Sequence, residues 1–231
     1  MEVAAEWILW KDDVRVKGMF ITFEGVDGCG KSTQMRFAAE YLREKGYSLL
    51  LTREPGGCSI AEKIRTLLLD VANSEMTGRT EALLYAAARA QHVAEVIAPA
   101  VRRGTVVLCD RFLDSSLAYQ GVGRDLGVDK IARINEFAID GVMPDKTFFL
   151  DFPPDLAFRR MNEKRVHDRL ETQGGEFYLE LYNGFVALAE KWPERIVRIN
   201  ASGTKFETRE IVCAKITKIL KAAGVEPGGA D

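Results

Sequence analysis

The stretch Gly25 to Ser32, GVDGCGKS, fits the phosphate-loop pattern GxxxxGK[ST], and it constrains the possible fold more than any other part of the chain. The apolar run from Met19 to Phe23 predicts a buried strand before the loop, and Thr33 to Lys45 predicts a helix after it. Its glycines allow successive backbone N–H groups to face one anion, with the positive end of the helix behind them. The stretch therefore predicts a strand, a loop and a helix that bind a phosphate chain.

Within such a loop, Lys31 is expected to reach the β- and γ-phosphates, and the Ser32 hydroxyl is expected to bind Mg²⁺. A second carboxylate that supports the metal commonly follows an apolar run, and both Asp110 and Asp151 fit this description. We favour Asp110, because Asp151 precedes two prolines and is equally suited to capping a helix. The predicted ATP-binding residues of the loop are Gly25, Val26, Asp27, Gly28, Cys29, Gly30, Lys31, Ser32 and Thr33.

Further short apolar runs, with helical stretches between them, predict an α/β fold with a five-stranded parallel sheet and helices on both faces. Ligands should gather at the carboxyl ends of the strands. A chain of 231 residues suits one domain. We expect an N-terminal extension (1–18), a single domain (19–221) with a short lid at about 159–175, and a flexible tail (222–231). The four additional strand candidates are Tyr47 to Thr52, Thr105 to Cys109, Lys146 to Leu150, and Arg195 to Ile199.

Composition limits the partners of the chain. A total of 32 basic and 34 acidic residues gives a net charge of -2, so no global field favours nucleic acid or an anionic membrane. The four cysteines show neither CxxC spacing nor a disulfide-dense pattern, which indicates reduced thiols and a cytoplasmic location. No run approaches the roughly 20 apolar residues of a membrane span, so we expect a protein without membrane or nucleic-acid partners.

One segment, Leu108 to Gln120 (LCDRFLDSSLAYQ), closely resembles the signature of the thymidylate kinases. Three other motifs follow the family's order and spacing, namely REPGG at Arg53 to Gly57, AEKIR at Ala61 to Arg65, and LLYAAARAQ at Leu83 to Gln91. The resemblance covers roughly residues 19–220. It implies a three-layer P-loop nucleotide kinase fold, usually a homodimer, that uses ATP and Mg²⁺ to phosphorylate dTMP to dTDP.

On the acceptor side, Arg111 and Arg65 resemble the residues that hold the acceptor phosphate in this family, and Arg53 is close enough in sequence to assist. Glu54 resembles a family glutamate near the acceptor and the metal, although it could also be a turn residue before Pro55. A phosphate monoester has a second pKa of about 6 and is largely a dianion at neutral pH, so it needs no general base. Catalysis should therefore depend on positioning and on neutralising charge.

The thymine base is expected to contact Tyr85 and Arg89, which are four residues apart and thus share one helix face. The resemblance implies that Tyr85 stacks on the base, where the family commonly has phenylalanine, and that Arg89 donates to a base oxygen. From the residues alone, Tyr85 could instead be a core aromatic residue. By resemblance, Ser116 and Gln120 make further base contacts, and Tyr119 lies where it could close against the sugar.

Asp27 is unexpected, because a carboxylate inside a phosphate loop should repel the nucleotide. The resemblance implies that Asp27 accepts a hydrogen bond from the 3′-hydroxyl of the acceptor sugar. The alternative is that Asp27 stabilises the backbone of its own loop.

The phosphate loop has no arginine at its variable positions, and the chain in this respect resembles the bacterial type of the family, which carries the equivalent cation in the lid. Arg165 is the preferred cation, with Lys164 and Arg169 as alternatives, and Arg160 is expected to lie against adenine. The predicted catalytic residues are Lys31, Glu54, Arg111 and Arg165.

Two other functions remain open at this point. The chain could phosphorylate another pyrimidine nucleotide such as dUMP, since one methyl group in an apolar pocket provides only about 1–3 kcal/mol of discrimination. It could also be a P-loop ATPase switch without an acceptor substrate, although the arginines of the acceptor site would then have no purpose.

Overall fold

The computed structural model describes residues 18–162 and 174–228. Its centre is a five-stranded sheet with the strand order β2-β3-β1-β4-β5, and all neighbouring strands are parallel. The predicted sheet is thus confirmed. The strands are β1 (Met19–Glu24), β2 (Leu49–Arg53), β3 (Val106–Asp110), β4 (Lys146–Asp151) and β5 (Ile196–Asn200).

The predicted strand positions agree with these bounds to within two residues. The largest difference is at β2, which begins at Leu49 and not at Tyr47. Gly46 has a φ angle of 83°, and the N–H of Tyr47 donates to the carbonyl oxygen of Leu42, 3.1 Å away. This is the helix-ending geometry in which a left-handed glycine follows the last turn. Tyr47 therefore belongs to the turn that caps the preceding helix and is not part of the strand.

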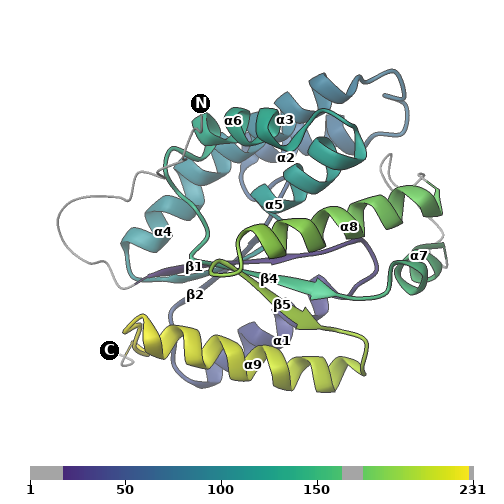
Figure 1. Ribbon diagram of the computed structural model, residues 1–231. Helices are drawn as coiled ribbons and strands as arrows, with labels where there is room; N and C mark the ends of the chain where they lie inside the picture. The colour runs from purple at the N-terminus through teal and green to yellow at the C-terminus, as the bar shows by residue number, and fades with distance from the viewer. Residues whose placement is uncertain (1–17, 163–173, 229–231) are drawn as a thin grey trace.

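Helices cover both faces of the sheet and give three layers (Figure 1). In the orientation of Figure 1, α1 and α9 lie below the sheet, whereas α3, α5, α6 and α8 lie above it. The helical elements are α1 (Lys31–Glu44), α2 (Ser59–Leu69), α3 (Gly78–His92), α4 (Ala98–Arg102), α5 (Leu113–Ser116), α6 (Val128–Ile139), α7 (Pro154–Asn162), α8 (Gly175–Lys191) and α9 (Lys205–Ala222), with the π-helical segments η1 (Val93–Ile97) and η2 (Leu117–Gly123).

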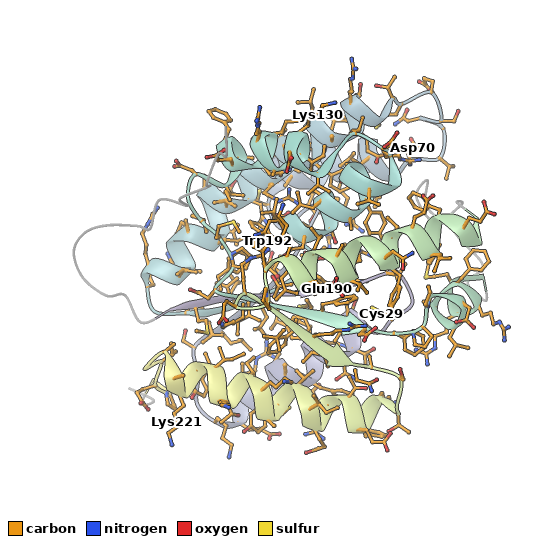
Figure 2. All side chains as sticks on the ribbon, in the orientation of Figure 1. Cys29, Asp70, Lys130, Glu190, Trp192 and Lys221 are labelled. Atoms are coloured by element: carbon orange, nitrogen blue, oxygen red, sulfur yellow. The ribbon has the colours of Figure 1, made fainter. Side chains whose placement is uncertain are left out.

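The central strands are buried on both faces, as their continuous apolar runs predict. Every residue of β1 is buried, and aromatic rings from β1 and β4 pack within the sheet layers, for example Phe23 against Phe148 with ring centroids 5.4 Å apart. Figure 2 shows side chains filling the space between the sheet and the helices on both faces, while Lys130 and Lys221 project outward. The resulting rigid sheet fixes the positions of the loops at its carboxyl edge.

The packed part of the chain extends beyond the predicted domain boundary at residue 221. α9 ends at Ala222, and Val225 is a buried member of the core that donates its N–H to the carbonyl oxygen of Leu220 at 3.0 Å. Within residues 18–162 and 174–228, no helix has the length and apolar character that crossing a membrane requires.

Candidate active site

The phosphate loop joins the end of β1 to the start of α1. Gly25, Gly28 and Gly30 have φ angles of 136°, 83° and 99°, values that residues with a Cβ rarely adopt. The Nζ of Lys31 donates to the carbonyl oxygens of Gly25 (3.0 Å) and Val26 (2.9 Å). The loop therefore encloses a positive charge at the start of a helix, which is the arrangement that attracts a phosphate chain.

Not every loop residue faces the predicted nucleotide with its side chain. Val26 and Cys29 have buried side chains, with exposed fractions of 1% and 4%, so they can contact a nucleotide through their backbone. The N–H of Thr33 donates to the carbonyl oxygen of Gly30 at 3.1 Å. A Cβ at Gly28 would lie 2.5 Å from the carbonyl oxygen of Ala157, which shows that the loop packs directly against α7.

Ser32 and Asp110, the two predicted metal ligands, are in contact. The Ser32 hydroxyl donates to Oδ2 of Asp110 at 2.5 Å. Asp151 instead accepts hydrogen bonds from Tyr182 (2.9 Å) and Arg198 (2.7 Å). A hydroxyl and a carboxylate are hard oxygen ligands of the kind that Mg²⁺ prefers, with water and phosphate oxygens completing its octahedron. The donor set at Ser32 and Asp110 therefore fits Mg²⁺.

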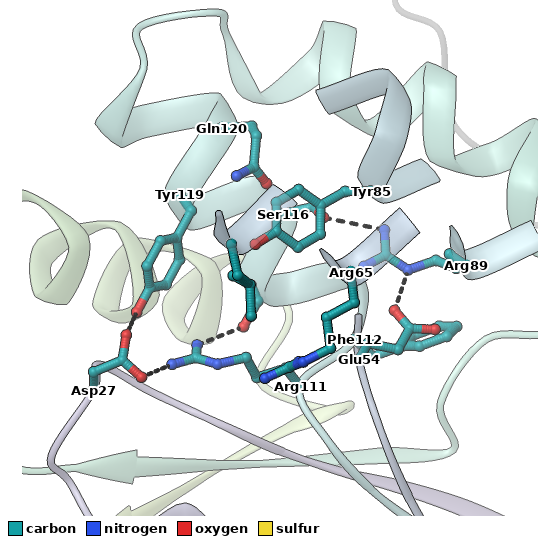
Figure 3. Close-up of a pocket in the computed structure, with 12 residues that line it drawn as sticks. Asp27, Glu54, Arg65, Tyr85, Arg89, Arg111, Phe112, Ser116, Tyr119 and Gln120 are labelled. Atoms are coloured by element: carbon teal, nitrogen blue, oxygen red, sulfur yellow. Dashed lines mark hydrogen bonds and ion pairs between the residues drawn. The ribbon is translucent and has the colours of Figure 1, made fainter. Parts of the chain in front are cut away.

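A pocket opens beside the phosphate loop, and Figure 3 shows its walls. All of the predicted substrate-binding residues line this one pocket, although they come from the phosphate loop, the β2 and β3 ends, α2, α3, α5 and η2. Three lining residues, Leu69, Phe112 and Ser115, were not predicted. The complete lining is Asp27, Glu54, Arg65, Leu69, Tyr85, Arg89, Arg111, Phe112, Ser115, Ser116, Tyr119 and Gln120.

Arg111 is held at one end of the pocket by several contacts (Figure 3). Its backbone has a φ angle of 67°, which is unusual for a residue with a long side chain and which occurs most often at functional sites. Its guanidinium group donates to the hydroxyl of Ser115 at 3.0 Å and to the carbonyl oxygen of Gly25 at 3.3 Å, and it forms an ion pair with Asp27. These contacts direct the guanidinium group toward the phosphate loop.

Asp27 stays ionised in this setting. Burial alone would raise the pKa of its carboxyl group, but the charges of Arg111 and Lys31 and a hydrogen bond from Tyr119 hold that pKa below its ordinary value of 3.8. The Tyr119 hydroxyl donates to Oδ2 of Asp27 at 2.7 Å. Asp27 thus binds side chains of the acceptor pocket, and this contact was not anticipated by either interpretation of the sequence.

At the other end of the pocket, Arg89 is almost completely buried, with 1% of its surface exposed. Its Nε donates to Oε2 of Glu54 at 2.8 Å, and its Nη1 donates to the hydroxyl of Ser116 at 3.1 Å and to the side-chain oxygen of Asn135. The ring of Phe112 lies 5.0 Å from the guanidinium carbon. The carboxylate of Glu54 is therefore engaged with Arg89, not with the Ser32 and Asp110 pair.

The amide of Gln120 is oriented by a buried glutamate. Its Nε2 donates to Oε1 of Glu81 at 2.9 Å, and Arg124 also donates to the Glu81 carboxylate. Because a carboxylate accepts hydrogen bonds, the nitrogen of the amide must face Glu81, and the carbonyl oxygen of Gln120 is the acceptor that can serve a ligand. Glu81 follows the N-terminus of α3 by one turn, and the π-helical turn of η2 carries Gln120 toward it.

The two arginines near Pro55 have different surroundings. Arg65 lines the pocket and donates to the carbonyl oxygen of Pro55 at 2.8 Å. Arg53 donates to the same oxygen at 2.9 Å, but its guanidinium group pairs with Glu62 and its side chain is 45% exposed. Arg53 is not among the residues that line the pocket, and its assistance at the acceptor phosphate stays a prediction.

Sequence reasoning also missed Glu24, which does not line the pocket but binds two residues that do, Phe112 and Ser115. It ends β1 just before the phosphate loop, and it is completely buried. Its carboxylate accepts from the N–H of Phe112 (2.7 Å) and from the hydroxyl of Ser115 (2.5 Å). Burial and the nearby Asp114 raise the pKa of Glu24 from 4.5 to about 7. The available sequence signal for Glu24 was the position of an acidic residue at the end of a buried strand.

The lid prediction is partly outside the described residues. Arg160 lies on α7, where its guanidinium carbon is 4.2 Å from the ring centroid of Phe152 and its Nη1 is 3.4 Å from the carbonyl oxygen of Gly28. This side chain therefore borders the phosphate loop. Lys164, Arg165 and Arg169 lie outside the residues that the structure describes.

Comparison with known proteins identifies the family. The family model described as thymidylate kinase matches residues 23–212. The thymidylate kinase of Geobacillus sp. (strain WCH70) is 50% identical over 189 residues, which cover 81% of this chain and 90% of that protein. The thymidylate kinase of Exiguobacterium sp. (strain ATCC BAA-1283 / AT1b) is 50% identical over 211 residues, which cover 91% of this chain and 100% of that protein.

Comparison with solved structures gives the same family. The crystal structure of thymidylate kinase from Ehrlichia chaffeensis matches with a TM-score of 0.68 at 35% sequence identity, covering 88% of this chain and 98% of that one. The resemblance in the individual motifs thus extends along almost the whole chain and to its three-dimensional structure. This chain belongs to the thymidylate kinase family.

Proposed function

We propose that this enzyme transfers the γ-phosphoryl group of ATP to the phosphate of dTMP and so forms dTDP. The observation that carries the proposal is the position of the pocket, whose wall includes Asp27 of the phosphate loop and Arg111 at the end of β3. ATP bound by the loop and a nucleotide in the pocket would have their phosphates adjacent. Positioning of the two reactants is the main contribution that a phosphoryl-transfer enzyme makes.

Arg111 and Arg65 are the proposed ligands of the acceptor phosphate. Both line the same pocket, and guanidinium groups bind phosphate oxygens in a bidentate manner. The acceptor is largely a dianion at neutral pH, so its oxygen attacks without transfer of a proton to the protein. Lys31 and Arg111 would neutralise the charge on the two phosphates as they approach.

We propose that thymine binds between Tyr85, Arg89, Ser116 and Gln120. Tyr85 and Arg89 lie on the same face of α3 and both line the pocket. Thymine presents two carbonyl oxygens and one N–H group along its edge. The Arg89 guanidinium can donate to a carbonyl oxygen, while the carbonyl oxygen of Gln120, set by Glu81, can accept from the N–H group. These contacts also suit uracil, so the apolar surroundings of the methyl group must provide the preference for dTMP.

The sugar is proposed to lie between the base and the phosphate, against Tyr119 and Asp27. The Tyr119 hydroxyl and Asp27 are 2.7 Å apart and both line the pocket. An ionised carboxylate is a strong hydrogen-bond acceptor, which supports recognition of the 3′-hydroxyl by Asp27.

We propose that Mg²⁺ binds at Ser32 and Asp110, where it would neutralise the charge on the ATP phosphates. The two oxygen ligands are 2.5 Å apart.

We propose that Glu54 does not bind the metal and acts on the acceptor site through its contact with Arg89. A lid at about 159–175 is proposed to bring Arg165 to the transferred phosphoryl group, with Arg160 against adenine.

A homodimer is the proposed assembly. The neighbouring helices α2, α3 and α6 carry exposed apolar side chains, Leu67 (52%), Leu83 (57%) and Phe137 (91%). Exposed apolar surface of this kind is typical of an interface, and two-fold dimers are the commonest assembly. Light scattering should therefore give twice the mass of the chain, and a monomer at micromolar concentration would contradict the proposal.

A cytoplasmic location is also proposed. The four cysteines are free and buried, which supports a reducing environment.

The reaction is tested by measuring ADP formation from ATP and Mg²⁺ with different acceptors. We expect rapid ADP formation with dTMP, slower formation with dUMP, and background rates with dAMP, thymidine or no acceptor. Equal ADP release without any acceptor would show an ATPase switch instead. A rate with dUMP equal to the rate with dTMP would assign the enzyme to pyrimidine deoxynucleotides in general.

A further inference from the structure

His92 is a buried residue at the last position of α3, three residues after Arg89. Its side chain is completely buried and does not line the pocket. Both ring nitrogens have partners: Nδ1 lies 3.0 Å from Oε1 of Glu54, and Nε2 lies 2.7 Å from the hydroxyl of Thr52. The imidazole thus connects the end of β2 to α3.

The direction of these hydrogen bonds follows from the chemistry of the partners. The Glu54 carboxylate also accepts from the Nε of Arg89, so it is an acceptor for both neighbours. Nδ1 of His92 must therefore carry a proton and donate it to Oε1, whether the ring is neutral or charged. In the neutral ring, Nε2 then accepts from the hydroxyl of Thr52.

Glu54 is consequently held from two sides. Oε1 accepts from His92, and Oε2 accepts from Arg89, whose Nη1 continues to Ser116. If the imidazole donor were missing, one oxygen of a buried carboxylate would lose its partner, and the carboxylate could rotate away from Arg89. The space for the ring is limited as well, because a Cβ at Gly57 would lie 2.4 Å from Nε2 of His92.

We propose that His92 is a positioning residue for recognition of the acceptor base. It fixes the orientation of the Glu54 carboxylate, and Glu54 in turn fixes the guanidinium group of Arg89. This inference rests on the proposed function, in which Arg89 contacts the base of dTMP. The phosphate end of the pocket, at Arg111, is held by separate contacts with Asp27 and Ser115.

Two substitutions separate the roles of the ring nitrogens. In His92→Asn, the side-chain nitrogen occupies the δ position and can still donate to Glu54. In His92→Gln, the nitrogen occupies the ε position, so it can reach Thr52 but cannot reach Glu54. Glu40→Gln, at an exposed position of α1 on the opposite face of the sheet, serves as the control.

We expect His92→Gln to raise KM for dTMP about tenfold, the effect of losing one hydrogen bond to a charged group, while KM for ATP changes by less than about twofold. His92→Asn should restore KM for dTMP to within about threefold of the wild type. The inhibition constant of 2-deoxyribose 5-phosphate, which lacks the base, should be the same in all variants. Equal KM values in the Asn and Gln variants, or equal losses for dTMP and the abasic inhibitor, would overturn the inference.

Thermal unfolding shows whether the variants fold. If neither histidine variant folds, Glu54→Gln, which keeps the side-chain volume, should give the same selective loss of dTMP affinity, and unchanged dTMP affinity would overturn the inference. Measurements on the wild-type enzyme distinguish failure of this inference from failure of the proposed function. Failure of the wild type to phosphorylate dTMP would refute that function, whereas wild-type activity with no difference between His92→Asn and His92→Gln would refute the role of His92 alone.

Discussion

Glu24 is expected to make the stability of this enzyme depend on pH near neutrality. The residue is completely buried at the end of β1, its carboxylate faces Asp114, Arg111 and Ser115, and its pKa is raised from 4.5 to about 7. The pKa is raised first by burial and then by the charge of Asp114. The folded protein therefore binds a proton at Glu24 more tightly than the unfolded chain does.

The sign and size of the effect follow from this difference. Well below pH 4.5, Glu24 is protonated in both the folded and the unfolded state, so its raised pKa does not change the free energy of unfolding. As the pH rises from 4.5 to about 7, the unfolded chain releases the proton first, so the free energy of unfolding falls. One pKa unit corresponds to about 1.4 kcal/mol, which gives a total loss of about 3 kcal/mol.

Glu24→Gln removes this titration and should flatten the pH profile. Between pH 5 and pH 8, the free energy of unfolding of the variant should rise relative to the wild type by about 2 to 3 kcal/mol. Altered hydrogen bonds to Phe112 and Ser115 would add an offset of about 1 to 2 kcal/mol that is nearly independent of pH. Urea unfolding at intervals of half a pH unit measures the difference, with Glu40→Gln at an exposed position of α1 as the control. Parallel profiles for the wild type and Glu24→Gln would refute the reasoning.

Three further predictions concern catalysis. Arg111→Ala should raise KM for dTMP by about 10- to 100-fold, the range for charge-assisted hydrogen bonds, with little change in ATP affinity; full turnover at low dTMP would contradict the assignment. Chelation of Mg²⁺ should abolish turnover, and Asp110→Asn should raise the Mg²⁺ concentration for half-maximal rate, whereas an unchanged Mg²⁺ titration would exclude Asp110 as a ligand. Arg165→Ala should lower kcat by about 100-fold or more without altering the ATP dissociation constant, and an unaffected kcat would transfer the role to Lys164 or Arg169.

The sheet was predictable because its strands are short apolar runs that end in polar residues, and this pattern depends on local sequence alone. The same property places loops at one edge of the sheet, but the expectation that Asp27 and Tyr119 lie beside the same sugar came from the family resemblance; both residues line the pocket. The start of β2 was less predictable. Leu49 and Tyr47 are both suitable strand residues, and the choice between them depends on how Gly46 ends the preceding helix.

The partners of the buried charges could not be predicted from the sequence. Glu54 was assigned to the acceptor site, but nothing in its local sequence indicates that its two oxygens bind Arg89 and His92. Glu24 and Glu81 were not considered, because an isolated acidic residue is most often solvent-exposed. Such contacts join residues that are dozens of positions apart, so they become visible when the tertiary structure is known.

Two of the three arginines that line the pocket, Arg89 and Arg111, are oriented by carboxylates of the protein itself. Arg111 pairs with Asp27, and Arg89 pairs with Glu54. Several cations in one pocket would repel one another, and each carboxylate both reduces this repulsion and restricts the direction of its arginine. The two pairs differ in burial: the side chains of Arg89 and Glu54 are 1% and 3% exposed, against 17% and 25% for Arg111 and Asp27. In the proposed complex, a phosphate dianion would therefore compete for Arg111, which is the more exposed of the two, while the Arg89 pair would stay intact and present a fixed donor to the base. Under the proposed function, the same type of ion pair would provide an exchangeable phosphate site at one end of the pocket and a rigid recognition site at the other.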